Sequence, residues 1–372
     1  MSAQSTDAEG ESEEPLHIVV YFSEESAEGY PFNIPEYRQS YFDFFSFSVR
    51  EHSHVKFFIC RGRSYLGDGK FSKGEFFDPV TNTLIPENEV IHANLVYNKG
   101  DLLIASGDRV SLVNDLEFDR ICCDKAQSAF LFPEEFPKTI EVFSADEVVD
   151  ASSQLHTDRF VVKPARGQEG KGVKIFSKTD FQEYKYNAKG PLVVQEFLDT
   201  SHGIPGICDA EHDLRVLLMN GEIVQAYVRT PQKGKLLSNV SKGASLLEIE
   251  KDALSETLLR IVRKVDTKFS GFFPRIYSVD FGYTPDGWKI FEFNSQPGLP
   301  YPSWDKYYHR WHKKLIETLL SHPLLHAPSG VSHSSEVFGY PYSWSFSSYT
   351  KHRSNILENR LYGVRIFLGN RA

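Results

Sequence analysis

The sequence predicts a mixed α/β protein, with α/β and α+β lobes following one another along the chain. Three observations support this fold class. Short apolar runs typical of buried strands alternate with mixed segments through the first third of the chain. A strand–glycine loop–strand pattern and then two hairpins with flanking helical segments follow. With 372 residues and 41% hydrophobic content, the chain can bury the cores of two or three lobes.

An N-terminal α/β lobe is expected over residues 15–120. It is preceded by a small, polar and acidic stretch, residues 1–14, which predicts a disordered tail. Apolar runs in this lobe predict strands at residues 16–21, 55–60 and 95–97. The dense aromatic cluster at residues 41–47 predicts either side chains packed against a sheet or a binding surface.

A central subdomain is expected over residues 121–198. Strands are predicted at residues 160–164 and 173–176, and the loop between them contains three glycines. A helix near residues 178–185 and a strand at residues 192–197 should complete this subdomain.

A last subdomain is expected over residues 199–325. Asn220–Gly221 is the signal for a two-residue hairpin between strands 213–219 and 222–229. The remaining predicted elements are a helix at 252–269, a hairpin with strands 276–283 and 288–293, and a closing helix at 305–320. Residues 326–372 lack clear periodicity and are predicted to form an extension of uncertain order.

The charge pattern and the cysteines exclude several classes of protein. The net charge is −9 and no long basic block is present, so neither nucleic-acid nor membrane binding is expected. The four cysteines form no CxxC pair, which favours a reducing compartment. No signal peptide is visible, and no apolar run reaches the ~18 residues of a spanning helix, so a cytoplasmic protein is expected.

The strongest chemical signal is the hairpin that contains Asp280, Glu292 and Asn294. Thr284-Pro285-Asp286-Gly287 suits a turn, and a three-residue loop with a bulge would place Thr284 opposite Trp288. Asp280 would then face Glu292, whereas a two-residue loop would send the two carboxylates to opposite faces.

The same three side chains predict a metal site. Glu292 and Asn294 share one strand face, and Phe291 and Phe293 are expected on the other face, against the core. Facing carboxylates repel each other unless a cation lies between them, and oxygen ligands of this kind suit Mg²⁺. An ordinary polar hairpin is the alternative.

Other segments supply weaker signals. Lys163 ends a strand beside a loop that contains Gly170 and Gly172, and glycines let backbone N–H groups approach phosphate oxygens. A flexible surface hairpin would explain this loop equally well. Asp213 and Arg215 share a strand face near Arg229, where a guanidinium could bind phosphate or carboxylate or simply form an exposed salt bridge.

The order of these segments resembles the ATP-grasp superfamily, and in particular the ribosomal-protein glutamate ligases and glutathione-synthetase-like enzymes. The resemblance covers roughly residues 120–300 and is most specific at Val279-Asp280 and at residues 292–299. It implies an ATP-grasp fold that follows an N-terminal α/β pre-grasp lobe.

The resemblance also implies roles for individual residues. Magnesium, with Mn²⁺ as an alternative, would be held by Asp280, Glu292 and Asn294. Contacts with ATP would come from Lys125, Lys163, Gly170, Gly172, Glu196, Phe197, Leu198 and Asp213. Arg215 and Arg229 would face the phosphate or an acyl-phosphate intermediate. One departure concerns Leu237-Ser238-Asn239, where related ligases often carry Arg-Ser-Asn, so that Lys235 or Lys242 would have to supply the cation.

The predicted function is an ATP-dependent carboxylate–amine ligase that releases ADP and phosphate. Its substrates would be a small-molecule or peptide carboxylate and an amine, neither identified by the sequence, and a homo-oligomer remains open. One alternative is a kinase of the same fold acting on a polyol or inositol phosphate, with the basic residues at 309–314 near the phosphate. The other is a nucleotide-binding regulatory module with little turnover.

Overall fold

The computed structural model describes residues 14–105, 107–167, 171–181, 184–185, 190–232, 245–304 and 306–326. These residues form two compact units. The first unit combines the described residues up to Val113 with those from Gly298 onward, and the second runs from Asn114 to Pro297. The units are therefore divided differently from the predicted domains, since the closing helix groups with the N-terminal lobe. The predictions for residues 1–13 and 327–372 lie outside the described residues.

A six-stranded sheet with the order β6-β5-β2-β1-β8-β9 forms the centre of the first unit. The predicted strands are confirmed as β1 (Leu16–Phe22), β2 (Val55–Arg61) and β8 (Leu95–Asn98). β1 lies parallel to both β2 and β8. The other elements are α1 (Pro35–Glu51), β3 (Tyr65–Gly67), β4 (Lys70–Phe71), β5 (Gly74–Asp78), β6 (Thr83–Glu87), β7 (Ile91–His92), β9 (Leu112–Val113), α6 (Tyr308–Leu320) and the 3₁₀ turns Gly62–Ser64 and Pro323–Leu325.

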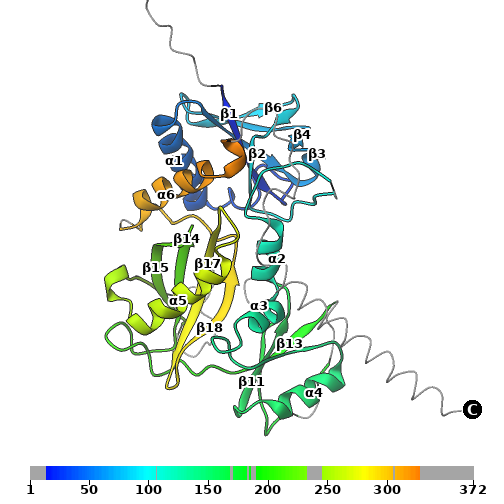
Figure 1. The fold of residues 1–372 in the computed structure, drawn as a ribbon, viewed down its shortest axis with the longest axis vertical. Coiled ribbons are helices and arrows are strands. Elements are labelled where there is room, and N and C mark those ends of the chain that lie inside the picture. The colour runs from blue at the N-terminus through cyan, green and yellow to red at the C-terminus, as the bar shows by residue number, and fades with distance from the viewer. Residues whose placement is uncertain are drawn as a thin grey trace, which may run out of the picture. The chain divides into compact units, whose positions relative to one another are not determined.

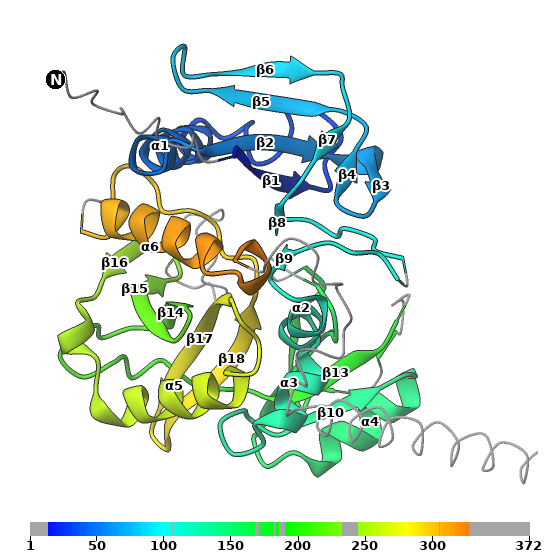
Figure 2. The ribbon, with the colours of Figure 1, turned by 45° about the horizontal axis from the view of Figure 1, so that its top comes forward.

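The aromatic cluster of residues 41–47 lies on α1 and packs into the core of this unit. Phe44 and Phe45 are fully buried, and the Phe45 ring stacks on Phe57 of β2 with 4.6 Å between ring centroids. The packing interpretation of the cluster is therefore confirmed. Helix α6 lies beside α1, far from it in sequence (Figure 2), and the Tyr308 hydroxyl donates to Asp43 at 2.6 Å.

Two antiparallel sheets form the second unit (Figure 1). The four-stranded sheet has the order β10-β13-β11-β12, and the five-stranded sheet has the order β16-β15-β14-β17-β18. The strands of the first sheet are β10 (Thr139–Val142), β11 (Arg159–Pro164), β12 (Lys174–Ser177) and β13 (Leu192–Glu196). Those of the second are β14 (Asp213–Met219), β15 (Glu222–Thr230), β16 (Ser245–Glu248), β17 (Ile276–Thr284) and β18 (Gly287–Asn294). The helices are α2 (Leu116–Cys123), α3 (Lys125–Leu131), α4 (Ala145–Gln154) and α5 (Glu256–Phe269).

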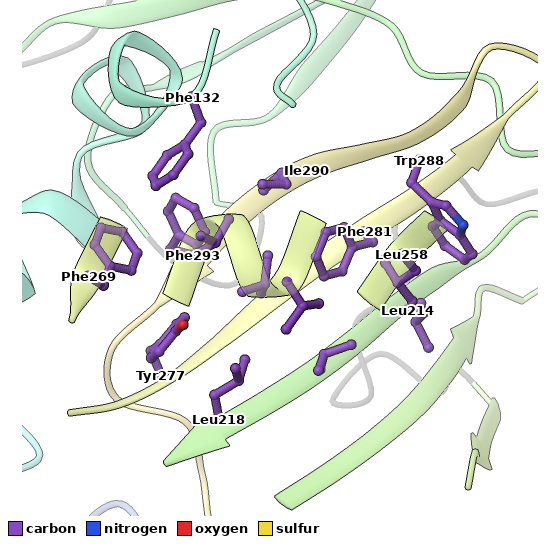
Figure 3. Packing of buried hydrophobic residues seen from close by; sticks show 14 of the residues in the cluster. Phe132, Leu214, Leu218, Leu258, Phe269, Tyr277, Phe281, Trp288, Ile290 and Phe293 are labelled. Carbon is purple, nitrogen blue, oxygen red and sulfur yellow. The ribbon is translucent and has the colours of Figure 1, made fainter. Parts of the chain in front are cut away.

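The main core of this unit lies between the five-stranded sheet and α5 (Figure 3). Helix α5 buries Leu258, Val262, Val265 and Phe269 at the 3.6-residue spacing of an amphipathic helix. The helix was predicted from residue 252 but begins at Glu256. Ser255 caps it by accepting from the Leu258 N–H, and a separate 3₁₀ turn occupies Lys251–Ala253.

The β14–β15 hairpin is confirmed, but the helix predicted near residues 178–185 is wrong. Asn220 and Gly221 have φ values of 48° and 86°, as a two-residue hairpin turn requires. Among the described residues near 178–185 none is helical, and residues 178–180 form a turn. Phe181 instead packs edge-on against Phe160 of β11, so aromatic packing on the sheet replaces helical pairing.

Candidate functional site

The five-stranded sheet has one apolar face and one polar face. The side chains of Val216, Val228, Val279 and Phe293 belong to the core shared with α5. Because neighbouring residues of a strand point to opposite faces, the residues between these point away from the core. They include the predicted site residues Asp213, Arg215, Arg229, Asp280, Glu292 and Asn294.

Asp280 lies directly opposite Glu292, as predicted, but the loop that connects their strands is shorter than predicted. Thr284 pairs with Gly287, which leaves only Pro285 and Asp286 in the turn. The register then shifts by one residue between Asp280 and Phe281. A bulge inside β18 therefore supplies the extra residue that was assigned to the turn, and it brings both carboxylates to one face.

Phe291 is the extra residue of this bulge, and its predicted position in the core is wrong. Phe293 belongs to the core, whereas Phe291 is only half-buried and lines a cavity together with Glu292. Its ring lies over Gly282, where an added Cβ would come within 2.7 Å of the ring. Gly282 is therefore required because the aromatic ring occupies the space of a side chain.

Two arginines surround the Asp280 carboxylate. Arg215 donates from Nε to Oδ1 and from Nη2 to Oδ2, both at 2.6 Å. Arg229 Nη2 donates to the same Oδ2 at 2.7 Å and also to Asp213 Oδ2. The register explains the cluster, since Arg215 pairs with Asp280, and Asp213 pairs with Arg229.

Burial and charge have opposite effects on the two aspartates of this cluster. Burial raises the pKa of Asp280, but the guanidinium groups of Arg215 and Arg229 outweigh burial and hold its pKa below the usual range. Burial also raises the pKa of Asp213, and here Arg229 offsets only part of the effect, so that the pKa stays above the usual range. Asp280 is therefore the permanently charged member of the pair.

A cavity of about 320 Å³ lies beside this cluster, within the second unit. It is lined by both sheets and by the segment that connects them, residues 197–213. Of the predicted site residues, its lining includes Lys125, Lys163, Glu196, Phe197, Leu198, Asp213 and Glu292. Asp213 connects the cavity to Arg229 and, through it, to Asp280.

Cationic side chains line the part of the cavity that adjoins Glu292. Lys125, the first residue of α3, donates to the Gly167 carbonyl at 2.7 Å and lies 3.8 Å from Glu292 Oε2. Lys163 is buried, and this burial lowers its pKa from 10.5 to about 8, with further lowering by Lys125 and partial compensation by Glu292. Two ammonium groups that line the same cavity favour an anionic ligand.

The end of β13 and the residues after it also line the cavity. The Glu196 carboxylate accepts from the backbone N–H groups of His156 and Lys138, so it is already engaged. The Phe197 ring lies under the Arg159 guanidinium, 3.9 Å from its centroid. Phe197 and Leu198, with Val161, Val173 and Ile175, give the cavity an apolar lining of the kind that suits a planar heterocycle.

The structure describes only part of the glycine loop. Gly172 has φ +75° and an added Cβ would lie 3.1 Å from Pro164, so glycine is required there. Gly167 and Lys171 line the cavity. Gly170 lies outside the described residues, as do Leu237, Ser238, Asn239 and the lysines proposed to replace the missing cation, Lys235 and Lys242.

Several residues of the cavity lining were not predicted, among them Arg159, Phe291 and His212. His212 is buried, its Nε2 accepts from the Tyr283 N–H at 3.0 Å, and its Nδ1 lies 3.1 Å from the Ala210 carbonyl. These two contacts fix a neutral imidazole, and burial lowers its pKa. The Ala210 contact is local, but Tyr283 lies 71 residues further along the chain, so no local sequence pattern could have revealed the contact with Tyr283.

The basic residues at 309–314 do not form a phosphate site by themselves. His312 is buried on α6 against Tyr308 and Phe44, and burial lowers its pKa to about 4. Lys313 and Lys314 each lie 3.9 Å from Glu317 on the same helix. These residues therefore form an ordinary helix face with ion pairs along the helix and one packed histidine.

Among the described residues, no cluster of three or more His, Cys, Asp or Glu side chains could hold a metal ion. The predicted metal site has only two carboxylates, with an asparagine as the third ligand. No described helix is long and apolar enough to cross a membrane.

The fold and this site together define an ATP-grasp protein. A model of the RimK-like ATP-grasp domain matches residues 131–317, and the chain belongs to this family. It is 26% identical over 168 residues to a probable alpha-L-glutamate ligase of Psychromonas ingrahamii, covering 44% of this chain and 51% of that protein. It is 30% identical over 126 residues to a glutathione synthetase of Bradyrhizobium diazoefficiens, covering 32% and 37% respectively. The chain thus spans about half the length, or less, of the curated relatives it matches.

Solved structures confirm the predicted ATP-grasp fold. The D-alanyl-alanine synthetase A of Vibrio cholerae is similar with a TM-score of 0.53 at 15% identity, covering 84% of this chain and all of that one. A D-cycloserine synthetase is similar with a TM-score of 0.53 at 13% identity, covering 82% and 99%. At such identities the similarity concerns the fold alone.

Proposed function

We propose that this protein is an ATP-dependent carboxylate–amine ligase, which forms an amide or peptide bond and releases ADP and phosphate. Membership of the RimK-like ATP-grasp family supports the use of ATP, and the curated relatives are named as ligases and synthetases. The single observation that carries the proposal is the cavity that joins Lys125 and Lys163 to Glu292 and, through Asp213, to the Arg215–Asp280–Arg229 cluster.

In the proposed arrangement, the nucleotide lies in the 320 Å³ cavity. The apolar lining at Phe197 and Leu198 contacts the adenine ring. Backbone groups of Glu196 and Leu198 supply polar contacts to the edge of that ring. Lys125 and Lys163, with Gly170 and Gly172 of the glycine loop, bind the phosphates. Asp213 lies at the junction between the nucleotide and the arginine cluster.

The donor atoms of Asp280, Glu292 and Asn294 fit a magnesium ion. All three offer oxygen, and two are carboxylates that directly face one another. Asn294 Oδ1 already accepts from the Gln296 N–H at 2.9 Å, which orients its amide. When bound there, Mg²⁺ (or Mn²⁺) would neutralise charge on the phosphates. Arg215 and Arg229 compete with a metal ion for the oxygens of Asp280.

The proposed chemistry needs no covalent enzyme nucleophile. The substrate carboxylate attacks the γ-phosphorus of ATP, which gives an acyl phosphate and ADP, and the amine then displaces phosphate from the acyl carbon. Arg215, once released from Asp280, stabilises the anionic acyl phosphate and the tetrahedral oxyanion. Arg229 holds Asp213 and limits the negative charge next to the nucleotide.

The proposal is tested by measuring ADP and phosphate release over pairs of amino acids and short peptides, with the full chain, ATP and Mg²⁺. Release only when both an acid and an amine are present is the expected result. Production of AMP, or of a stable phosphorylated product instead of an amide, would contradict it. The second result would revive the kinase alternative, which none of the relatives or structures named above supports.

The substrates and the cellular context belong to the same proposal. The acid and the amine are small molecules or peptides, by analogy with the glutamate ligases and the glutathione synthetase among the relatives. We place the reaction in the cytoplasm, where ATP and reduced thiols are available. Self-association into a homo-oligomer is left to a measurement of mass in solution.

A further inference from the structure

The polar face of the five-stranded sheet carries several buried polar atoms without a hydrogen-bond partner among the described residues. They are Asp213 Oδ1, Gln225 Nε2, Arg229 Nε and Ser278 Oγ. An unpartnered buried donor or acceptor opposes folding, and native proteins contain few of them. Other such atoms lie elsewhere in both units, but these four share one face of one sheet beside the proposed active site, where a ligand could complete their bonds.

Gln225 and Ser278 form a pair within this group, because they lie in one row across neighbouring strands. Both pair with Leu217 of β14, Gln225 from β15 and Ser278 from β17. Two strand spacings separate their backbones, roughly 10 Å, with the buried Leu217 side chain between them. A glutamine side chain is long enough to approach a group held above Leu217.

This row is adjacent to the proposed reaction centre. Ser278 precedes Asp280 by two residues on β17 and therefore points to the same face, roughly 7 Å away along the strand. Ser278 also pairs with Asn294 of β18. A substrate whose reacting group lies beside Asp280 would thus place a second functional group, a few bonds away, over Gln225 and Ser278.

The chemistry of the row identifies that second group. The Gln225 amide nitrogen is a donor only, and the Ser278 hydroxyl can donate as well. The row of Gln225, Leu217, Ser278 and Asn294 contains no acidic side chain. The next row contains Arg215 with Asp280 and Glu292, and Arg215 can supply positive charge to a ligand once it is released from Asp280, as proposed above. Two donors beside a guanidinium are complementary to a carboxylate.

We propose that Gln225 and Ser278 are specificity-determining residues that bind a non-reacting carboxylate of an amino-acid or peptide substrate. The inference rests on the proposed function, because it assumes that the reacting carboxylate or amine lies beside Asp280. The carboxylate recognised can belong to the amine-supplying substrate or to the acid that is activated, and the substrates used in the test distinguish these two sources.

The first test is made on the full chain without ligand. Gln225→Leu and Ser278→Ala each remove an unpartnered buried atom, so thermal unfolding should occur at the same or a higher temperature than in the parent protein. Each matched control variant removes a hydrogen bond that is present in the structure. Gln195 Nε2 donates to Thr139 Oγ1 at 2.7 Å and Ser128 Oγ donates to the Ile121 carbonyl at 2.7 Å, so Gln195→Leu and Ser128→Ala should unfold at lower temperatures. If Gln225→Leu and Ser278→Ala were destabilised like the controls, their role would be structural and the inference would be wrong.

The second test measures ligand binding in the presence of ADP and Mg²⁺. The probes are L-glutamate, L-alanine and glycylglycine, together with L-alaninol, in which an alcohol replaces the carboxylate. At least one carboxylate probe should raise the unfolding temperature of the parent protein, alaninol should not, and both variants should lose this response while keeping the response to ADP. Equal responses from the parent and both variants would overturn the inference.

Kinetics then separates the two sources of the carboxylate. With an active acid–amine pair, each variant should raise KM about tenfold for the substrate that carries the recognised carboxylate. The KM for ATP and kcat should change less than twofold. Unchanged KM values for both the acid and the amine would overturn the inference. If no acid–amine pair leads to ADP release, the proposed function is wrong. The unfolding temperatures of the ligand-free variants do not depend on turnover, so they test the roles of Gln225 and Ser278 separately.

Discussion

Arg215 holds both carboxylate oxygens of Asp280, one through Nε and one through Nη2, each at 2.6 Å. Arg229 adds a third bond, to Oδ2 at 2.7 Å. Asp280 is almost completely buried, so these bonds provide its charge compensation. A cation that takes Asp280 as a ligand therefore competes with these arginines for the carboxylate, and an arginine released by this competition becomes available for an anion.

We predict that Arg215→Lys strengthens Mn²⁺ binding in the absence of nucleotide, by several-fold. Lysine keeps the positive charge but cannot form the two parallel bonds, so it competes less well for Asp280. The measurement is a titration of free Mn²⁺ by electron paramagnetic resonance. Arg275→Lys is the matched control, because Arg275 contacts both oxygens of Asp266 on α5, outside the proposed metal site. Unchanged Mn²⁺ affinity in Arg215→Lys would contradict the competition between arginine and metal.

Asp280→Asn and Glu292→Gln should differ in stability although both remove a proposed metal ligand. Asp280→Asn leaves Arg215 and Arg229 without their buried anion and should lower the free energy of unfolding by about 3 kcal/mol. Glu292 is partly exposed, and its nearest cation is 3.8 Å away, so Glu292→Gln should change stability by less than about 1 kcal/mol. Urea denaturation measures both.

Loss of ADP release in Glu292→Gln, with stability retained, is then the cleaner test of the metal site. Full ADP release in this variant would remove Glu292 from the proposed metal ligands. A physiological function that survives in this variant without ADP release would favour the regulatory module.

Gly282→Ala should weaken nucleotide binding through Phe291. The added Cβ would lie 2.7 Å from the Phe291 ring and 2.9 Å from Thr200 Cγ2, so the ring must move, and it lines the proposed nucleotide cavity. We expect the Kd for ADP to rise at least tenfold, measured by calorimetry. Gly190→Ala is the control, since an added Cβ there meets nothing within 4 Å. Equal ADP affinity in the two variants would exclude this role for Phe291.

Because of Lys163, the affinity for ADP should fall as pH rises, whereas the stability of the ligand-free protein should increase. Burial lowers its pKa from 10.5 to about 8, so above pH 8 the folded protein loses the charge that the phosphates require. ADP affinity should fall as pH rises through 8, toward tenfold per unit. Between pH 8 and 10.5 the unfolded chain holds more protons than the folded chain, so this residue makes the ligand-free protein more stable as pH rises.

Lys163→Met should abolish both trends, which calorimetry and denaturation at several pH values can measure. A lysine that titrates near its usual 10.5 would instead leave ADP affinity constant between pH 7.5 and 9.5.

Much of the fold was predictable because it depends on local patterns. The apolar runs at β1, β2 and β8 and the Asn220–Gly221 turn each determine their structure through short-range sterics and burial. The prediction failed near residues 178–185, where Phe181 and Tyr184 pack against aromatic residues of the sheet. Contacts of this kind are distant in sequence and override local helical spacing.

In the candidate site, too, local patterns were predictable from the sequence and contacts between distant segments were not. The sequence by itself determined which residue types lie on one strand face, and so it identified Asp280, Glu292 and Asn294. Tertiary structure decided how the two carboxylates come to face each other, through a bulge at Phe291 rather than a longer turn. It also decided that Asp280 bonds Arg215 and Arg229 and that His212 holds the Tyr283 backbone. The physical reason is that side-chain alternation is set within a strand, whereas bulges, ion pairs and cavities depend on which segments pack together.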